Sequence, residues 1–211
     1  MDEAIQAVLS EYDKRVAAER EIQSKFPDEG WLDRRDEFLI SVGRDTGVLL
    51  NILAKGVNAK TILELGTSYG YSTVWLAEAA RKTGGKVISL DVSAPKQEYA
   101  REMLKKAGLA AQVDFRLGDA RETIASLAGP FDFVLLDLWK DLYIECLDLF
   151  YPKLSAGAFI AADNMLRPQT YLANALLYRK HVRAKPNISS VLLPIGSGVE
   201  LSRYGDAIAI G

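Results

Sequence analysis

Two aspartates and one asparagine stand where two apolar segments of the sequence end, and together they could bind a metal ion. Asp137 follows the apolar stretch 131–136, and Asp163 and Asn164 follow the apolar stretch 158–162. This pattern is typical of buried strands whose C-terminal ends open into a site, and open α/β sheets bind their ligands at that end. Carboxylate and amide oxygens are hard ligands that suit Mg²⁺, with water and substrate in its other positions. The sequence therefore predicts a Mg²⁺ site at these three residues.

Lys140 follows Asp137 by three residues, so its amine could reach the same place. A lone lysine is more often a solvated surface residue, and only its neighbours favour a chemical role here. The acids have ordinary explanations too, because Asp137 and Asp163 could cap helices and Asn164 could hold a left-handed turn.

The strands that carry these residues belong to a regular alternation of strand and helix patterns joined by short glycine-bearing turns. The predicted strands are residues 61–65, 87–90, 113–117, 131–136 and 158–162. The predicted helices are residues 71–81, 95–107, 120–127, 141–151 and 171–183. Such an alternation indicates parallel βαβ units, so we predict a doubly wound, Rossmann-like α/β sheet. Two later strands, at 188–193 and 199–210, are expected to form a hairpin at the sheet edge.

Two further helices are predicted before the first strand. Residues 2–25 have apolar residues at helical spacing and end before Pro27, and a second helix is expected over about 33–54. We interpret them as a cap on one domain rather than a second domain. The predicted division is 1–55 for the N-terminal helices and 56–211 for the core of a single domain, 1–211.

Composition excludes several functional classes. The chain has 211 residues, 49% of them hydrophobic and 26% charged, which is typical of one globular domain. A net charge of −2 without blocks of like charge predicts no nucleic-acid partner and no anionic membrane surface. The acidic N-terminus, the lack of a long apolar run and the single cysteine, Cys146, predict a cytoplasmic protein.

The end of the first predicted strand has features of a nucleoside site. Gly66 and Gly70 follow that strand and precede a helix, which allows a tight turn and close approach to a ligand. Asp91 ends the next strand, where a carboxylate can bind ribose hydroxyls, and Asp119 follows the third strand, where it could meet an adenine. These acids, with Glu64, could also be ordinary cap or loop residues.

The glycine spacing separates two classes of cofactor. A dinucleotide site needs a second glycine where this chain has Ser68, so that pattern is not met. S-adenosylmethionine has no phosphate and carries a cationic sulfonium, which the acidic Glu64 at the strand end suits. We therefore favour S-adenosylmethionine over a dinucleotide.

Four short motifs stand before or at the ends of these strands: Val42-Gly43; Leu63-Glu64-Leu65-Gly66 with Gly70-Tyr71-Ser72; Leu136-Asp137-Leu138-Trp139-Lys140-Asp141 with Tyr143; and Ala162-Asp163-Asn164. Over roughly residues 38–204, the chain resembles the cation-dependent O-methyltransferases, the family of catechol and caffeoyl-CoA O-methyltransferases. The resemblance implies a seven-stranded sheet whose last strand is antiparallel.

The resemblance also implies roles for individual residues. Lys140 would be the general base, and Glu200 would accept a hydrogen bond from the hydroxyl that is not methylated. The implied Mg²⁺ ligands are Asp137, Asp163 and Asn164. The implied S-adenosylmethionine site consists of Val42, Glu64, Gly66, Ser72, Asp91, Asp119, Asp137 and Trp139. Glu200 could equally be a salt-bridged strand acid, and Trp139 could be a core aromatic residue.

Two departures from the family pattern bear on the substrate. Leu138 stands where the catechol enzymes have a histidine near the adenosine, and Ser197 replaces an aspartate common in the caffeoyl-CoA branch. The second departure disfavours acyl-CoA substrates. Residues 38–41, 165–170 and 196–200 are expected to shape the acceptor pocket.

The predicted function is Mg²⁺-dependent methyl transfer from S-adenosylmethionine to a small catechol-like phenol. Two neighbouring hydroxyls can chelate one cation, which stabilises the phenolate and orients it for attack. The alternatives are a larger natural product, an acyl-CoA ester or an amino-acid-derived hydroxyl as acceptor, a nucleotide-binding oxidoreductase, and a non-catalytic binding module. A homodimer is a further possibility, with the amphipathic N-terminal helix as its surface.

Overall fold

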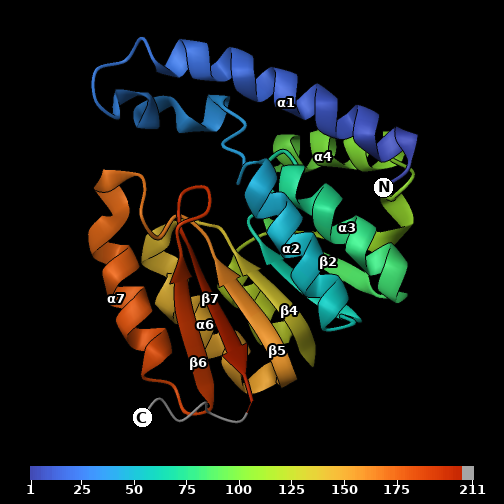
Figure 1. Cartoon of the computed structure of the whole chain (residues 1–211), viewed down its shortest axis with the longest axis vertical. Coiled ribbons are helices and arrows are strands. Elements are labelled where there is room, and N and C mark those ends of the chain that lie inside the picture. Colours follow the sequence, from blue (N-terminus) through green and yellow to red (C-terminus); the bar gives the residue numbers. More distant parts are fainter. Residues whose placement is uncertain (206–211) are drawn as a thin grey trace.

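The computed structural model describes residues 1–205 and has a seven-stranded sheet with helices on both faces (Figure 1). The strands are β1 (Thr61–Leu65), β2 (Lys86–Asp91), β3 (Val113–Leu117), β4 (Phe131–Leu136), β5 (Leu154–Ala162), β6 (Ile188–Leu193) and β7 (Val199–Tyr204). The α-helices are α1 (Glu3–Gln23), α2 (Arg44–Gly56), α3 (Tyr71–Thr83), α4 (Ala94–Lys106), α5 (Ala120–Ser126), α6 (Tyr143–Phe150) and α7 (Leu172–Arg183).

The order of the strands confirms the predicted doubly wound sheet. The order is β3-β2-β1-β4-β5-β7-β6, with parallel pairing from β3 through to β5. β7 is antiparallel to both of its neighbours, so the last strand in the sequence is the antiparallel one. The order reverses between β1 and β4, and such a switch point is where open α/β sheets bind their ligands.

The alternation of side chains along the strands creates two apolar cores, one on each face of the sheet. On β4, Phe133 and Leu135 belong to the core beneath α1 to α4. Val134 and Leu136 belong to the core beneath α5, α6 and α7. A strand buried on both faces reads as a continuous apolar run, which explains why β4 was predicted with its observed bounds.

The predicted second helix, 33–54, is wrong. Residues Gly30–Glu37 form a 3-10 helix, η1, and an extended segment separates it from α2, which begins at Arg44. Gly43 has a φ of 83°, a conformation that an α-helix cannot contain, so the chain turns there before α2 begins. Phe38 and Leu39 in the extended segment are buried and anchor it to the core.

The N-terminal helix was predicted over 2–25 and is observed as α1. Ile5, Val8, Leu9 and Tyr12 on its apolar face are buried within the chain's own core. This apolar face is therefore covered by the chain itself, and a homodimer with the N-terminal helix as its surface stays a prediction. In Figure 1, α1 and η1 lie across the end of the molecule toward which β6 points.

Other bounds differ slightly. β5 begins at Leu154 rather than at 158, and residues 206–211 of the predicted last strand lie outside the described residues. Among the helices of residues 1–205, none combines the length and the apolar character that crossing a bilayer requires. The division of the chain into a 1–55 cap and a 56–211 core stays a prediction.

Candidate active site

Asp137 and Asp163 lie at the ends of adjacent strands, as the sequence predicted. The backbone N–H of Asp137 donates to the carbonyl oxygen of Leu65, which prolongs the pairing of β4 with β1. The N–H of Asp163 donates to the carbonyl oxygen of Leu136, which prolongs the pairing of β5 with β4. Both acids therefore stand at the carboxyl edge of the sheet, beside the switch point.

Asp163 is a buried acid, and one of its carboxylate oxygens lacks a hydrogen-bond partner within residues 1–205. Its side chain is 1% exposed, and its Oδ1 atom accepts no hydrogen bond in the described part of the chain. Burial raises the pKa of Asp163 to about 8, and repulsion from Asp137 adds to this rise. Two acids brought together with an unpaired buried oxygen form a place that a cation would stabilise.

Lys140 belongs to the same group. The residue is 8% exposed, and its Nζ lies 3.3 Å from Asp137 Oδ1, 2.9 Å from the Leu138 carbonyl oxygen and 2.6 Å from Tyr143 Oη. The interpretation of Lys140 as a solvated surface lysine is therefore wrong. Tyr143 Oη also donates to the carbonyl oxygen of Asp163 at 3.2 Å, so this fully buried tyrosine connects the lysine to the end of β5.

Asn164 has a φ of 60°, so it occupies the left-handed turn that directly follows β5. Its half-buried side chain is adjacent in sequence to Asp163. Residues 1–205 contain no group of three or more His, Cys, Asp or Glu side chains placed to hold a metal. The candidate set here has two carboxylates and one amide, and its hard oxygen donors fit Mg²⁺ with water completing the coordination.

A small cavity beside Asp137 brings together four of the eight predicted cofactor residues. Val42, Gly66, Ser72 and Asp137 line it, along with the segment 39–41. A Cβ atom on Gly66 would lie 2.1 Å from the carbonyl oxygen of Asp137, so only glycine permits this approach of β1 to β4.

Glu64 lies beneath this cavity rather than in its wall. The residue is fully buried, and its carboxylate accepts hydrogen bonds from Ser72 (2.6 Å), Thr73 (2.6 Å) and Ser89 (2.5 Å). Burial raises the pKa of Glu64 to about 7, although these hydroxyl donors partly offset the rise. Its observed contacts fix the first turn of α3 against β1 and β2, which positions Ser72 in the cavity.

Asp91 and Asp119 are also engaged by protein groups. Asp91 accepts hydrogen bonds from the N–H groups of Ser68 (2.7 Å) and Ser93 (2.8 Å). Asp119 caps α5 through the Arg121 N–H and forms an ion pair with the Arg121 guanidinium, which lowers the pKa of Asp119 to about 2. The cap-and-loop interpretation therefore describes their observed contacts, and their contact with a cofactor stays a prediction.

Trp139 is 39% exposed, so it is not a core aromatic residue. The guanidinium of Arg35 from η1 lies 4.5 Å from the centroid of a Trp139 ring. A cation stacked on an indole is a favourable contact. This contact joins η1 to the Asp137–Lys140 segment.

Glu200 has partners other than those that its predicted role requires. It is fully buried, with Arg183 Nε at 2.6 Å from one carboxylate oxygen and Arg179 Nε at 3.2 Å from the other. Glu200 pairs with Ala162 in the sheet, and that residue faces the core beneath α7. The structure therefore favours the salt-bridged strand acid, and the catalytic role of Glu200 stays a prediction.

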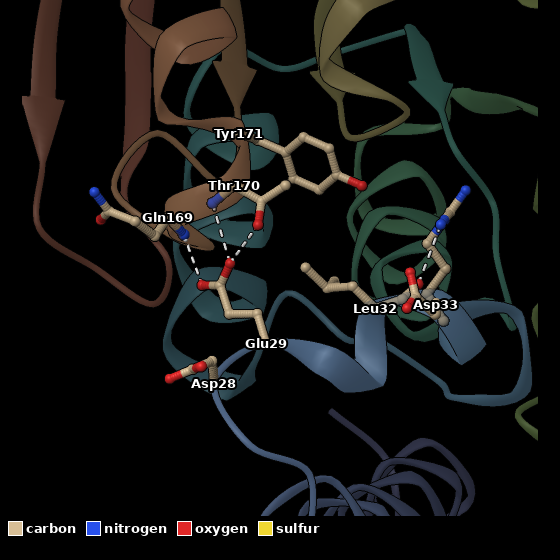
Figure 2. Close-up of a pocket in the computed structure, with 8 residues that line it drawn as sticks. Asp28, Glu29, Leu32, Asp33, Gln169, Thr170 and Tyr171 are labelled. Carbon is tan, nitrogen blue, oxygen red and sulfur yellow. Dashed lines mark hydrogen bonds between the residues drawn. The ribbon is translucent and has the colours of Figure 1, made fainter.

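An open groove of about 900 Å³ lies between η1 and the segment before α7 (Figure 2). Its lining comes from Asp28, Glu29, Leu32, Asp33, Arg35, Gln169, Thr170 and Tyr171. Residues 169 and 170 were expected at the acceptor pocket, whereas 38–41 belong partly to the cavity beside Asp137. Residues 28–35 were not predicted at the acceptor pocket, because 28–32 were expected to lie between two helices and 33–35 to begin the second one.

Comparison with known proteins identifies the family. A family model described as O-methyltransferase matches residues 33–204, so the chain belongs to this O-methyltransferase family. The chain is 39% identical over 132 residues to a catechol O-methyltransferase from Niastella koreensis. That match covers 61% of this chain and 59% of the Niastella protein, which is less than two thirds of the relative's length.

Two further proteins are similar over more of the chain. Caffeoyl-CoA O-methyltransferase 2 from Eucalyptus globulus is 31% identical over 205 residues, covering 87% of this chain and 79% of the relative. The crystal structure of cofactor-bound Rv0187 from MTB superposes with a TM-score of 0.74 at 28% identity, covering 98% of this chain and 92% of that protein. These matches agree with the family predicted from the motifs.

Proposed function

We propose that this protein transfers a methyl group from S-adenosylmethionine to one hydroxyl of a small ortho-dihydroxy phenol. The reaction would depend on a divalent cation, Mg²⁺ or one of similar chemistry. Asp137, Asp163 and Asn164 would hold the cation, and Val42, Gly66 and Ser72, which surround the small cavity beside Asp137, would contact the cofactor.

One observation carries this proposal above the others. Asp163 is buried beside a second carboxylate, and one of its oxygens has no partner in the described structure. An ionised carboxylate in this position is costly unless a positive charge completes the site, because a buried acid without a sufficient partner must otherwise take up a proton. Lys140 contributes one positive charge beside Asp137 but donates no hydrogen bond to the Asp163 carboxylate within residues 1–205.

The residues of the site would have separate roles in methyl transfer. When bound, the cation would stabilise the negative charge that develops on the acceptor oxygen. Lys140 Nζ, as a neutral amine after it has released its own proton, would accept the proton of the hydroxyl that is methylated, and its contacts hold it beside Asp137. Gly66 and Ser72 would orient the methyl donor, because an in-line transfer gains most of its rate from positioning.

The groove favours a small phenol over an acyl-CoA ester. Three carboxylates, on Asp28, Glu29 and Asp33, line it with a single guanidinium, on Arg35. A chain of phosphates placed there would meet an excess of like charge. A larger neutral natural product or an amino-acid-derived hydroxyl stays as the alternative acceptor. The match to an O-methyltransferase family does not support the oxidoreductase alternative.

The experiment that tests the proposal measures cofactor binding and acceptor choice together. We expect S-adenosylhomocysteine to bind in a calorimetric titration, and mass spectrometry to detect a mono-methylated product from catechol. Phenol, which lacks the second hydroxyl, serves as the matched acceptor and should give little product. Absence of binding would contradict the cofactor assignment, and equal methylation of phenol would contradict the ortho-dihydroxy class.

We further propose a cytoplasmic location, a single functional domain over residues 1–211, and a homodimer. The last of these would need a surface other than the apolar face of α1, because that face is buried within the chain.

A further inference from the structure

The groove between η1 and the segment before α7 has two walls that come from distant parts of the sequence. One wall is η1, which includes Leu32 and Arg35, and the other is the segment Gln169–Tyr171. In Figure 2, the side chains of Leu32 and Tyr171 lie at the groove, and Glu29 lies at the end where the two walls meet. A volume of about 900 Å³ is within the range of about 300–1,000 Å³ that ligand sites occupy.

Glu29 is the residue that joins the two walls. Its carboxylate accepts hydrogen bonds from the N–H of Gln169 (2.7 Å), the N–H of Thr170 (3.0 Å) and the hydroxyl of Thr170 (2.7 Å). Within residues 1–205, no other hydrogen bond connects residues 24–37 with residues 165–171. Hydrogen bonds to a carboxylate are stronger than neutral ones, so this contact is well suited to hold a surface segment in place.

Each wall has a second anchor that leads to the proposed active site. Arg35 of η1 stacks on Trp139, the residue before Lys140. The other wall follows Asp163 and Asn164 in sequence. Met165 and Leu166, which lead to this wall, donate their N–H groups to the turn between β6 and β7. Arg35 lines the groove and stacks on Trp139, so the groove is connected to the segment that carries Lys140, and Glu29 joins its two walls.

We propose that this groove receives the part of the acceptor that extends beyond its reacting hydroxyls, and that Glu29 is a positioning residue that fixes the groove by joining its walls. The inference rests on the proposed methyl transfer and adds to it the site that recognises the acceptor's substituent. Loss of the Glu29 contacts should let the walls separate, so a substituted catechol would lose more than an unsubstituted one.

The test compares Glu29→Ala with the control Glu37→Gln. Glu37 is an exposed acid at the end of η1, the 3-10 helix that Glu29 precedes, and it pairs with Arg34 rather than with the opposite wall. Hydrogen exchange of residues 166–172 reports on the contact without any substrate. We expect faster exchange at the Gln169 and Thr170 amides in Glu29→Ala, no change in Glu37→Gln, and an intermediate rate in Glu29→Gln, which keeps one acceptor oxygen.

Kinetics with two acceptors then test the role in recognition. The ratio of kcat/KM for a catechol bearing a two- or three-carbon neutral substituent to that for catechol itself should fall about fivefold to tenfold in Glu29→Ala, the size expected from losing one or two hydrogen bonds. The change should appear mainly in KM for the substituted acceptor. S-adenosylhomocysteine binding is measured on every variant and verifies that the core is folded.

Three results would overturn the inference, and they can be told apart. Unchanged exchange at residues 169 and 170 would show that Glu29 does not hold the wall. Faster exchange with an unchanged acceptor ratio would show that the groove does not recognise the substituent. Failure of the unaltered protein to methylate either catechol would remove the proposed function itself, and the recognition role with it.

Discussion

The acids at the ends of β4 and β5 and those at the ends of β1, β2 and β3 lie along one edge of the same sheet, yet their contacts differ. Glu64, Asp91 and Asp119 each accept at least two hydrogen bonds from nearby protein groups. Asp163 is as fully buried as Glu64, whereas Asp91 and Asp119 are half-buried, and one oxygen of Asp163 has no partner in the described structure. Asp137 has one long contact, with Lys140 at 3.3 Å.

The difference indicates where a ligand is needed. Acids whose oxygens are already paired can hold the backbone in shape without help, as Glu64 does for the first turn of α3. An unpaired buried oxygen beside a second acid is costly, so the fold is expected to retain it only for a cation or substrate. Replacing each acid by its amide should therefore separate the two groups.

The largest effect is expected for Asp163→Asn. Removing one carboxylate from the proposed metal site should reduce methyl transfer by more than about a hundredfold. Loss of a residue that only orients a metal ligand costs up to about a hundredfold, and loss of a ligand itself should cost more. Methyl transfer to catechol with saturating Mg²⁺ measures this. Asp148→Asn is the control, because Asp148 pairs with His181 and Lys185 instead. Full activity of Asp163→Asn would contradict the proposal that Asp163 is a metal ligand.

Lys140→Met should lower kcat by roughly a hundredfold or more, which is the typical contribution of a general base. Methionine keeps most of the side-chain volume at this buried position, so S-adenosylhomocysteine binding should persist. Lys105→Met, at an exposed position of α4, should retain wild-type kcat. A fully active Lys140→Met variant would show that another group accepts the proton.

Glu64→Gln should alter the pH dependence of stability rather than the chemistry. The folded protein raises the pKa of Glu64 from 4.5 to about 7, so it binds this proton more tightly than the unfolded chain. The contribution of Glu64 to the free energy of unfolding should therefore fall as pH rises from about 4.5 to about 7. Urea unfolding at pH 5 and pH 8 should show a smaller decline in Glu64→Gln than in wild type. An identical decline would mean that Glu64 is ionised throughout this range.

The smallest effect is expected for Asp119→Asn. Asparagine caps helices as well as aspartate does, so the free energy of unfolding should change by less than about 0.5 kcal/mol. Asp119→Ala, which lacks the cap, should lose about 1 kcal/mol. Thermal unfolding of both variants measures this. A large loss of turnover in Asp119→Asn would place this acid with Asp163, contrary to the comparison above.

Much of this sheet could be predicted from local patterns. β1, β3, β4 and β6 have their predicted bounds, because apolar runs between glycine-bearing turns depend on nearby residues alone. The position of Asp137 and Asp163 at one edge of the sheet could be predicted for the same reason, because parallel strands end at the same edge. The predicted family then agreed with the match over residues 33–204.

Other features depend on contacts between distant segments. Glu64 was expected to face the cofactor, but whether its oxygens were already paired depends on hydroxyl groups from α3 and β2. The arginines that pair with Glu200 come from α7, 17 and 21 residues away. The groove wall at η1 was missed because the predicted helix over 33–54 overlaps η1, and the burial of Phe38 and Leu39 that keeps the next segment extended depends on tertiary contacts.

The most direct test of the cation site is methyl transfer from S-adenosylmethionine to catechol by protein freed of metal with EDTA and then titrated with Mg²⁺. The proposal predicts negligible turnover without metal, saturable recovery with Mg²⁺ in the wild type, and no comparable recovery in Asp163→Asn. Turnover that is undiminished in EDTA would contradict it, because the unpaired oxygen of Asp163 would then need a different explanation.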